Sequence, residues 1–298
     1  MATYDSLINV DEWISDHYFT TDEGESFSKR VRNRTKEWAT FEAESGAPSP
    51  VKRLQVERGE LQQAFATQSP TDALVNHAFS YGPPEEQHYT RAGETFTYQG
   101  WVGNAGTLVV ISAEAAETTT EEDLTTLPVS GGLAAEGKEP EQAKVSKLVG
   151  DLFLAAEPPE FIVVLAGAWA IVAERESWPL GRYLAVNLQL AVERNDTKKA
   201  GELERVAVIL ARENLERAAD GTTWWAETRE ESQQHAVKVS GYLRDAVRES
   251  IEIIGNDVLD RRREQNLSLD GVDGNELAHQ SLRYLYRILF LLFAEASP

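Results

Sequence analysis

The spacing of hydrophobic residues predicts strands in the middle of the chain and helices on both sides of it. Apolar and polar residues alternate over 94–98, and 107–111 is a short β-branched run, so two strands are predicted there. The segment 161–174 is apolar on both sides of Ala166-Gly167, which predicts a β-hairpin that turns at this dipeptide. Another strand or a helix start is expected within 178–188.

The N-terminal residues are predicted to be helical. Residues 1–44 carry spaced aromatic and apolar side chains among charges and end in the turn-rich linker 44–50. A second helix is expected at about 51–67. The Ser and Asp residues within 69–72 are the expected caps of a third helix, which runs through His77.

The C-terminal third has helical spacing from Lys198 onward. Before it, acidic residues, Thr, Gly and Pro dominate 116–141, which predicts a mobile excursion that precedes a helix over 142–153. A helix is expected over 237–255, with Gly255-Asn256 as its stop. Its apolar stripe consists of Ser240, Leu243, Val247, Ile251 and Ile254.

The last predicted helix, 281–295, is apolar on nearly every face, and the sequence ends three residues later. A helix that is apolar all round is normally covered by other elements. We therefore expect its covering partner downstream of Pro298, so that these residues form the front of a longer protein.

Together the elements predict an α/β fold followed by an all-α region. Residues 1–50 form an N-terminal helical segment, 51–196 an α/β domain with a mixed sheet flanked by helices, and 197–298 a helical connector. A length of 298 residues allows one large domain or two ordinary ones, and we favour two.

The charge balance is strongly acidic. With 29 Lys+Arg against 49 Asp+Glu, the formal net charge is -20, which argues against binding duplex DNA by bulk attraction in dilute salt. The acids are spread along the chain and Arg outnumbers Lys, a composition typical of salt-loving cytoplasms. At molar salt the Debye length falls to about 3 Å, so excess acid need not repel a polyanion at range.

Several classes of protein are disfavoured by composition. The chain has no Cys, which removes disulfides, thiolate chemistry and Cys-bearing zinc sites, and its five His are widely separated. The N-terminus shows no export signal, and the longest apolar run is far shorter than a bilayer span. A cytoplasmic protein without membrane contact is expected. A phosphate-binding P-loop, a zinc-protease motif and a Gly-rich dinucleotide turn are also missing.

One order of elements resembles the core of restriction-type nucleases, which hold a divalent metal on two neighbouring strands. Glu94 and Glu114 are the candidate carboxylates for an active, Mg-dependent nuclease. Such a site also needs a Lys two residues after the second carboxylate, and Ala116 stands there. A degenerate nuclease-like sheet without activity is therefore the favoured reading.

Four other features are candidates for binding. Arg261-Arg262-Arg263 is the basic triplet of the chain and a candidate DNA contact, against the alternative of a solvated charge run. Arg182 beside Gly181 is a candidate anion contact, against a local ion pair. Trp224-Trp225 is a candidate platform for stacking bases, and His235 is a candidate polar contact. Both are more simply interpreted as core or structural residues.

Four segments of the second half, 159–167, 178–196, 231–252 and 285–295, resemble parts of large adenine-specific DNA methyltransferases of phage-defence and type IIG-like restriction-modification systems. The segments 231–252 and 285–295 are similar to the helices that precede the catalytic domain in that family. The segments 159–167 and 178–196 are similar to its nuclease-like N-terminal region. The resemblance covers about 159–298 and is weak before that.

The resemblance implies a role without catalysis by this chain. In that family a downstream domain binds S-adenosylmethionine and carries an Asn/Asp-Pro-Pro-Tyr/Phe motif, and Glu157-Pro158-Pro159-Glu160 does not match it. No cofactor is therefore expected in this chain, and S-adenosylmethionine is expected for the parent protein. The implied function is to position DNA or other defence-system subunits. The alternatives are an active nuclease and a protein-interaction scaffold that does not contact nucleic acid.

Overall fold

The computed structural model describes residues 5–22, 24–104, 106–115 and 121–296. The chain divides into two compact units, Met1–Gln233 and Gln234–Pro298. The first unit therefore includes both the N-terminal segment 1–50 and residues 197–233, which the hydrophobic pattern assigned to separate regions.

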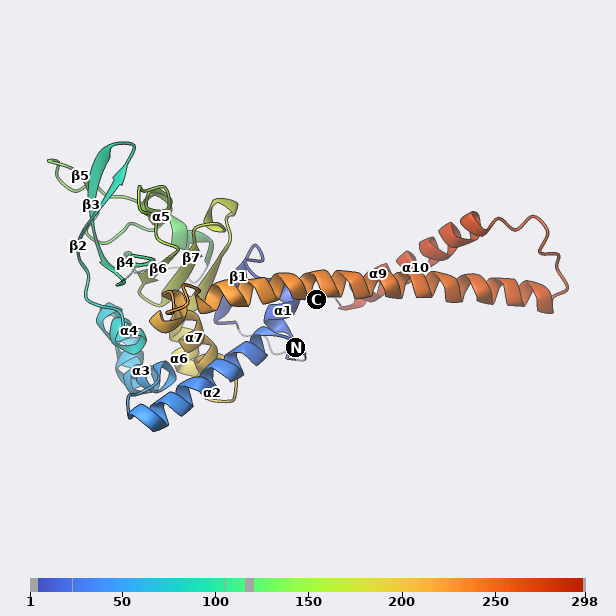
Figure 1. The fold of residues 1–298 in the computed structure, drawn as a ribbon, viewed down its shortest axis with the longest axis horizontal. Coiled ribbons are helices and arrows are strands. Elements are labelled where there is room, and N and C mark those ends of the chain that lie inside the picture. The colour runs from blue at the N-terminus through green and yellow to red at the C-terminus, as the bar shows by residue number, and fades with distance from the viewer. Residues whose placement is uncertain (1–4, 23, 105, 116–120, 297–298) are drawn as a thin grey trace. The chain divides into compact units, whose positions relative to one another are not determined.

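The first unit is built on one mixed sheet of eight strands, ordered β1-β8-β7-β6-β4-β3-β2, with β5 pairing with β3 (Figure 1). Of these pairs, β4 and β6 run parallel, and the other recorded ones are antiparallel. The strands are β1 (Leu7–Val10), β2 (Glu85–Arg91), β3 (Glu94–Val102), β4 (Leu108–Ser112), β5 (Leu133–Ala135), β6 (Phe161–Ala166), β7 (Trp169–Glu174) and β8 (Tyr183–Asn187).

The predicted hairpin at 161–174 is confirmed as β6 and β7, and every one of their side chains is buried. The turn lies at Gly167, whose φ of 63° is in the left-handed region that favours glycine. A Cβ at this position would also lie 2.8 Å from the Cβ of Ala115. Both facts explain why the chain turns here with a glycine.

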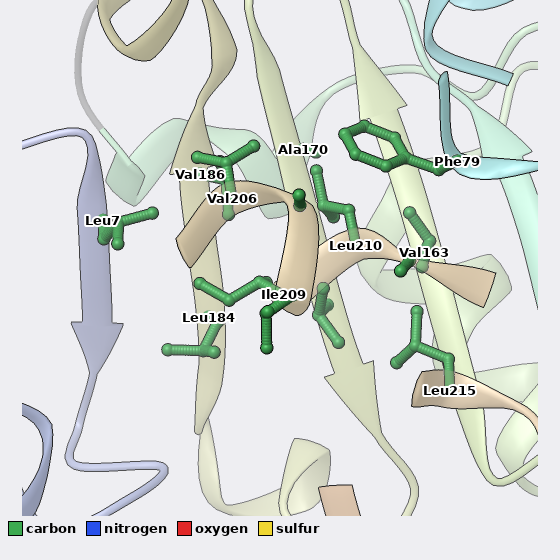
Figure 2. Close-up of a cluster of buried hydrophobic side chains, with 14 of the residues drawn as sticks. Leu7, Phe79, Val163, Ala170, Leu184, Val186, Val206, Ile209, Leu210 and Leu215 are labelled. Carbon is green, nitrogen blue, oxygen red and sulfur yellow. The ribbon is translucent and has the colours of Figure 1, made fainter. Parts of the chain in front are cut away.

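Two apolar layers cover the two faces of the sheet. On β6, Val163 and Leu165 point into one layer, and Ile162 and Val164 point into the other. In the first layer, helix α7 (Glu202–Leu210) lays its apolar face across β6, β7 and β8, as Figure 2 shows. A strand buried on both faces reads as a continuous apolar run, which is the pattern that the sequence has here.

The remaining helices of this unit are α1 (Asp16–Thr20), α2 (Phe27–Ser45), α3 (Pro50–Ala66), α4 (Asp72–Phe79), α5 (Val145–Phe153), α6 (Leu188–Arg194) and α8 (Arg212–Leu215), with 3₁₀ turns η1 (Glu121–Thr126) and η2 (Trp178–Leu180). The predicted break between the first two long helices is confirmed. Gly46 ends α2 with a φ of 73°, and the Ser49 hydroxyl accepts the amide of Lys52 to cap α3.

Three features of the N-terminal half differ from what the sequence pattern predicted. Residues 1–44 are not all helical, because β1 leaves the helical region and pairs with β8 at the sheet edge. Strand β2 was not predicted, because its exposed edge position lets it carry charged residues in place of an apolar alternation. The cap of α4 is Thr71, and no side-chain hydrogen bond is made there.

A buried arginine explains why the N-terminal segment and α7 belong to one unit. Arg205 of α7 is 0% exposed and donates to the carbonyls of Ala200 (2.9 Å) and Phe19 (3.3 Å) and to the hydroxyl of Ser28. A buried guanidinium needs such partners to offset its desolvation. Because Phe19 and Ser28 lie on α1 and α2, a domain boundary at 196/197 would separate the cation from two of its three acceptors.

The second unit consists of the C-terminal part of α9 (Trp224–Glu264) and α10 (Gly274–Ala296). The predicted helix stop at Gly255-Asn256 is wrong, since α9 continues to Glu264. An interior Gly costs only about 1 kcal/mol, and the good helix formers beyond it carry the helix on. Across the described part of the chain, no helix combines the length and apolar character needed to cross a bilayer.

Candidate functional site

The two carboxylates predicted for a metal site lie on neighbouring antiparallel strands, both on the side away from the turn that joins the strands. Glu94 is the first residue of β3 and is exposed. Glu114 lies two residues beyond the end of β4, is also exposed, and donates its amide to the carbonyl of Pro128 at 2.9 Å. The β3–β4 ladder is short, with the pairs Trp101↔Val110 and Val102↔Val109.

Beyond this ladder, the segment 128–135 lies between the two strands and keeps Glu94 away from Glu114. On one side β5 pairs with β3 through Phe96↔Ala135, and on the other Ala113 bridges to Val129. The described residues contain no group of three His, Asp or Glu placed to hold a metal ion. Ala116, which stands where the site would need a Lys, lies outside the described residues, as does the start of the acidic excursion.

The candidate DNA contacts belong to different units. Arg182 lies in the first unit, just before β8, where it is exposed and donates its backbone amide to Ser177 at 3.2 Å. The triplet 261–263 lies in the second unit, at the C-terminal end of α9. Their roles in binding stay predictions.

Within the triplet, the outer arginines make exposed local ion pairs and the middle one closes the helix end. Arg261 contacts Asp257 at 2.8 Å, and Arg263 contacts Asp260 at 2.6 Å. Arg262 donates to the carbonyl of Ser268 at 2.8 Å, in the loop after α9. Exposed pairs of this spacing contribute only about 0.3–0.5 kcal/mol, so Arg261 and Arg263 can exchange them for a phosphate at little cost.

The sequence pattern did not single out Glu174, which forms a buried ionic cluster at the end of β7. The residue is only 8% exposed. Its carboxylate accepts hydrogen bonds from Ser177 Oγ (2.7 Å), from Trp13 Nε1 (3.1 Å) and from the Arg229 guanidinium. Arg229 belongs to the second turn of α9, and its guanidinium also lies 5.8 Å from the Trp13 ring centroid. These contacts fasten the beginning of α9 to the sheet. The sequence did contain a signal for this cluster, because Glu174 ends the apolar run of β7 and so places a charge where the pattern predicts burial.

Around this cluster lies a cleft of about 330 Å³, in which acidic and basic side chains alternate. Glu160 accepts from the Arg217 guanidinium at 3.1 Å across it. Because Glu160 and Glu174 are each paired with an arginine of the same cleft, these four charges are used in holding the structure together.

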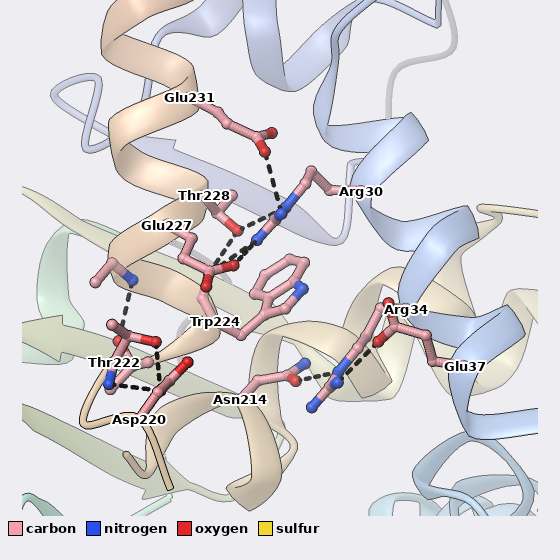
Figure 3. Close-up of polar contacts among 12 residues, drawn as sticks. Arg30, Arg34, Glu37, Asn214, Asp220, Thr222, Trp224, Glu227, Thr228 and Glu231 are labelled. Carbon is pink, nitrogen blue, oxygen red and sulfur yellow. Dashed lines mark hydrogen bonds and ion pairs between the residues drawn. The ribbon is translucent and has the colours of Figure 1, made fainter. Parts of the chain in front are cut away.

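A second set of contacts holds α9 to α2, through a fork made by Arg30 (Figure 3). Its two terminal nitrogens contact Glu231 and Glu227, each at 3.1 Å, and its Nε donates to the Thr228 hydroxyl at 3.3 Å. The guanidinium lies 5.0 Å from the centroid of the Trp224 ring. The first two turns of α9 are therefore anchored on both sides.

The tryptophan pair is part of this anchor. Trp225 is fully buried, and its ring centroid lies 4.8 Å from that of Trp13 and 5.8 Å from that of Phe27. Trp224 meets Trp225 edge-on at 5.1 Å. Trp225 is therefore a core residue, as the sequence analysis favoured, and it is not available for stacking with bases.

A buried carboxylate joins the β2–β3 hairpin to α5. Asp151 accepts from Lys147 Nζ (2.8 Å), from the Tyr89 hydroxyl (3.2 Å) and from the Arg91 guanidinium. Burial raises the pKa of the Tyr89 phenol to about 12, and the nearby Arg91 lowers it in part. The neutral phenol can therefore keep donating to Asp151 at all physiological pH values.

Comparisons with known proteins do not assign the chain to a family. None of the protein-family profiles matches it. No curated protein sequence and no solved structure gives a significant match either.

Proposed function

We propose that this chain is the non-catalytic N-terminal portion of a DNA adenine methyltransferase of an antiviral restriction-modification system, and that it positions DNA or partner subunits. In this proposal S-adenosylmethionine binds to the parent protein outside these residues, and the protein works in the cytoplasm. The motif resemblance of the segments 231–252 and 285–295 is its starting point.

The order of elements around β4 is the observation that carries the nuclease-like part of the proposal. Helix α4 is followed by the antiparallel strands β2, β3 and β4, then by η1, the short strand β5 and helix α5, and then by β6 parallel to β4. A helix between two parallel neighbours is the crossover that such a sheet needs. This arrangement supports kinship with the restriction-nuclease core, and the separation of Glu94 from Glu114 favours a degenerate site over an active one.

The proposed contact with DNA uses Arg261 and Arg263, with Arg182 as a further contact in the first unit. The outer arginines of the triplet are well exposed, at 70% and 61% of their side chains, and only weakly held by Asp257 and Asp260. At high salt the net charge of -20 is screened within about 3 Å, so short-range contacts to phosphate can act.

The test measures binding of a duplex by residues 1–298 as a function of KCl concentration. We expect binding that survives high KCl and that weakens in R261A/R263A, with the salt slope smaller by about one per lost phosphate contact. The matched control is R248A, because Arg248 is an exposed arginine of the same helix that pairs with Glu252 at 3.3 Å. Equal binding by both variants, or no binding at any salt concentration, would refute the DNA contact.

Calorimetry with S-adenosylmethionine tests the other half of the proposal. We expect no binding by this chain, and measurable affinity would place the cofactor site within it. Supercoiled plasmid incubated with Mg²⁺ or Mn²⁺ should stay uncut. Cleavage that is lost in E94A or E114A would establish the active-nuclease alternative.

A protein-interaction scaffold is the second candidate, and one observation favours it. Eight large apolar side chains within 284–293 of α10 are 37–70% exposed. A soluble monomer seldom leaves such a contiguous surface open. Absence of DNA binding together with defined protein association would select this alternative.

A further inference from the structure

The chain is acidic overall, but one stretch of α2 is strongly basic. Five of the 29 Lys+Arg residues lie within 29–36, and no Asp or Glu interrupts them. An even spread of 29 cations over 298 residues would place about one in such a stretch. A block of like charge this dense must be balanced either by groups within the protein or by an anionic partner. The five are Lys29, Arg30, Arg32, Arg34 and Lys36.

Two of the five cations are balanced within the protein. Arg30 pairs with two carboxylates of α9. Arg34 donates to Asn214 Oδ1 at 2.7 Å and pairs with Glu37 at 3.0 Å. The two guanidinium groups point from α2 toward α9 and α8, as Figure 3 shows. Arg30 and Arg34 are therefore used in holding the first unit together.

The other three, Lys29, Arg32 and Lys36, lie along one side of α2, because they are spaced by three and four residues. Lys36 is exposed, and its ammonium has no ion-pair partner among the described residues. Lys29 pairs with Glu25 at 2.5 Å, but the two side chains are 44% and 60% exposed, so this pair is weak. Arg32 donates to the carbonyl of Asp22 at 3.4 Å, which uses one of its five N–H donors. All three cations can therefore contact an anion in solution.

The loop before α7 adds two lysines beside this side of α2. The Arg205 guanidinium donates to the carbonyl of Ala200 at 2.9 Å and also to the hydroxyl of Ser28, which places the loop next to the first turn of α2. Ser28 lies one turn before Arg32. The lysines at 198–199 are exposed, and neither ammonium has an ion-pair partner in the described part of the chain. We call the five residues together the basic surface: Lys29, Arg32, Lys36, Lys198 and Lys199.

Three acids near the basic surface already have partners. Asp196 and Glu204 each accept a backbone amide of the loop, at 3.1 Å and 2.6 Å, and Asp22 lies 3.6 Å from the Arg205 guanidinium. At molar salt, charges further away than about 3 Å are screened. An anion in direct contact with the five cations is therefore attracted by them, although the chain as a whole is acidic.

We infer that the basic surface binds the phosphate backbone of duplex DNA without reading its sequence. Lys and Arg side chains are common donors to phosphate oxygens. Lys29 and Lys36 are seven residues apart, which is about 10 Å along the helix axis, so their long side chains can reach neighbouring phosphates of one strand. Four of the five residues are Lys, which acts as a point charge and lacks the bidentate fork with which Arg recognises a base.

The composition of the basic surface favours a duplex over other anionic partners. Its residues include no aromatic side chain on which the bases of a single strand would stack. They also include none of the aromatic anchors typical of protein interfaces, and no apolar face that would enter a membrane. Phe41 is 61% exposed, but it lies five residues after Lys36 and so faces another side of α2.

This inference rests on the DNA partner of the proposed function and adds a contact surface in the first unit. The triplet 261–263 belongs to the second unit. The two contacts can therefore be removed one at a time.

The test is the fluorescence anisotropy of a labelled duplex with residues 1–298, in KCl from about 0.3 M to about 1 M. Each phosphate contact contributes about 0.9 to the slope of log K against log salt, so K29A/R32A/K36A should make this slope shallower by about 2.7. At about 0.3 M KCl the release of one counterion is worth about three-fold, so the variant should bind roughly 20-fold more weakly. Alanine favours a helix, and circular dichroism checks that the helicity is kept.

Further variants locate the contact on the molecule. K198A/K199A should make the slope shallower by about 1.8. The matched control is K52A/K138A/K144A, which removes three positive charges at exposed lysines elsewhere in the first unit. Its affinity should stay within about two-fold of that of the unaltered chain. Two duplexes of unrelated sequence should bind equally, because no base is read.

An unchanged slope in K29A/R32A/K36A, or an equal loss in K52A/K138A/K144A, would overturn the inference. So would tighter binding to phosphatidylserine vesicles or to polyglutamate than to the duplex, because the basic surface would then suit a membrane or an acidic protein. A loss in R261A/R263A alone would overturn the inference and leave the proposed function standing. A loss in K29A/R32A/K36A alone would support the inference and refute the triplet as the DNA contact, whereas no duplex binding by the unaltered chain would overturn both.

Discussion

Arg229 of α9 and Glu174 of β7 form a partly buried ion pair that joins the longest helix of the chain to the central sheet. The pair lies 55 residues apart in sequence. Trp13 adds a third segment, because its indole nitrogen donates to the same carboxylate. The N-terminal segment, the hairpin and the beginning of α9 therefore depend on one acidic side chain.

Replacing this carboxylate should destabilise the first unit strongly. In Glu174→Ala the Arg229 guanidinium and two further donors lose their acceptor, and breaking a buried pair in this way costs about 3–5 kcal/mol. Urea unfolding at high KCl measures the change. The control is Glu176→Ala, which removes an exposed carboxylate two residues away and should change the free energy of unfolding by less than about 0.5 kcal/mol. Equal effects of the two variants would contradict the role of Glu174.

Two glycines should respond to alanine with opposite sign. Gly255 lies inside α9, and a methyl group there meets ordinary contacts at 3.9 Å, so Gly255→Ala should stabilise the helix by about 0.5–1 kcal/mol. Gly167 has a φ of 63° and no room beside Ala115, so Gly167→Ala should cost about 1–2 kcal/mol or more. Thermal unfolding of both variants measures the difference. Destabilisation by Gly255→Ala would argue that α9 does end where the sequence pattern placed its stop.

The helices and the inner strands were predictable because their local patterns agree with their environment. The hairpin at 161–174 is apolar on both faces and is buried on both faces. Strand β1 was missed, since its four residues, Leu7–Val10, gain their strand geometry from pairing with β8, which lies far away in sequence. Edge strand β2 was missed for a different reason, because its exposed edge position lets it carry charged residues in place of an apolar alternation. Local patterns cannot express a register that is set by a distant partner.

The site residues were less predictable than the fold, for a physical reason. Glu94 and Glu114 are near neighbours in a simple meander, but the segment 128–135 enters between their strands and separates them. Conversely, Glu174 gains its partners Trp13 and Arg229 only through tertiary folding. The sequence shows which side chains could bind a metal or form an ion pair. Whether two such side chains come into contact depends on inserted segments and on tertiary packing.

Stability should fall at alkaline pH because phenols are buried. Burial raises the pKa of Tyr18, Tyr81 and Tyr98, and it raises that of Tyr89 to about 12. An unfolded tyrosine ionises near pH 10, so the folded state holds these protons more tightly than the unfolded state. Their contribution is therefore fully present below about pH 10 and, for Tyr89, is lost between about pH 10 and pH 12.

Chemical unfolding at a series of pH values from 8 to 12 measures how steeply the free energy of unfolding falls with pH. Tyr89→Phe should make the fall above about pH 10 shallower, after the constant loss of its hydrogen bond to Asp151 is subtracted. Tyr242→Phe removes an exposed phenol and serves as the matched control. An unchanged slope in Tyr89→Phe would show that this phenol ionises equally in both states.

Salt should stabilise the folded chain, because a net charge of -20 repels itself most strongly when the chain is compact. Raising KCl from about 0.1 M to 1 M shortens the Debye length from about 10 Å to 3 Å, so most of the gain should appear within this range. Urea unfolding at fixed KCl concentrations measures the gain, and sucrose serves as an uncharged control, since it favours burial without screening charge. If sucrose reproduced the whole effect, the acidic surface would have no part in it. Full stability in dilute buffer would contradict the salt-loving interpretation of the composition.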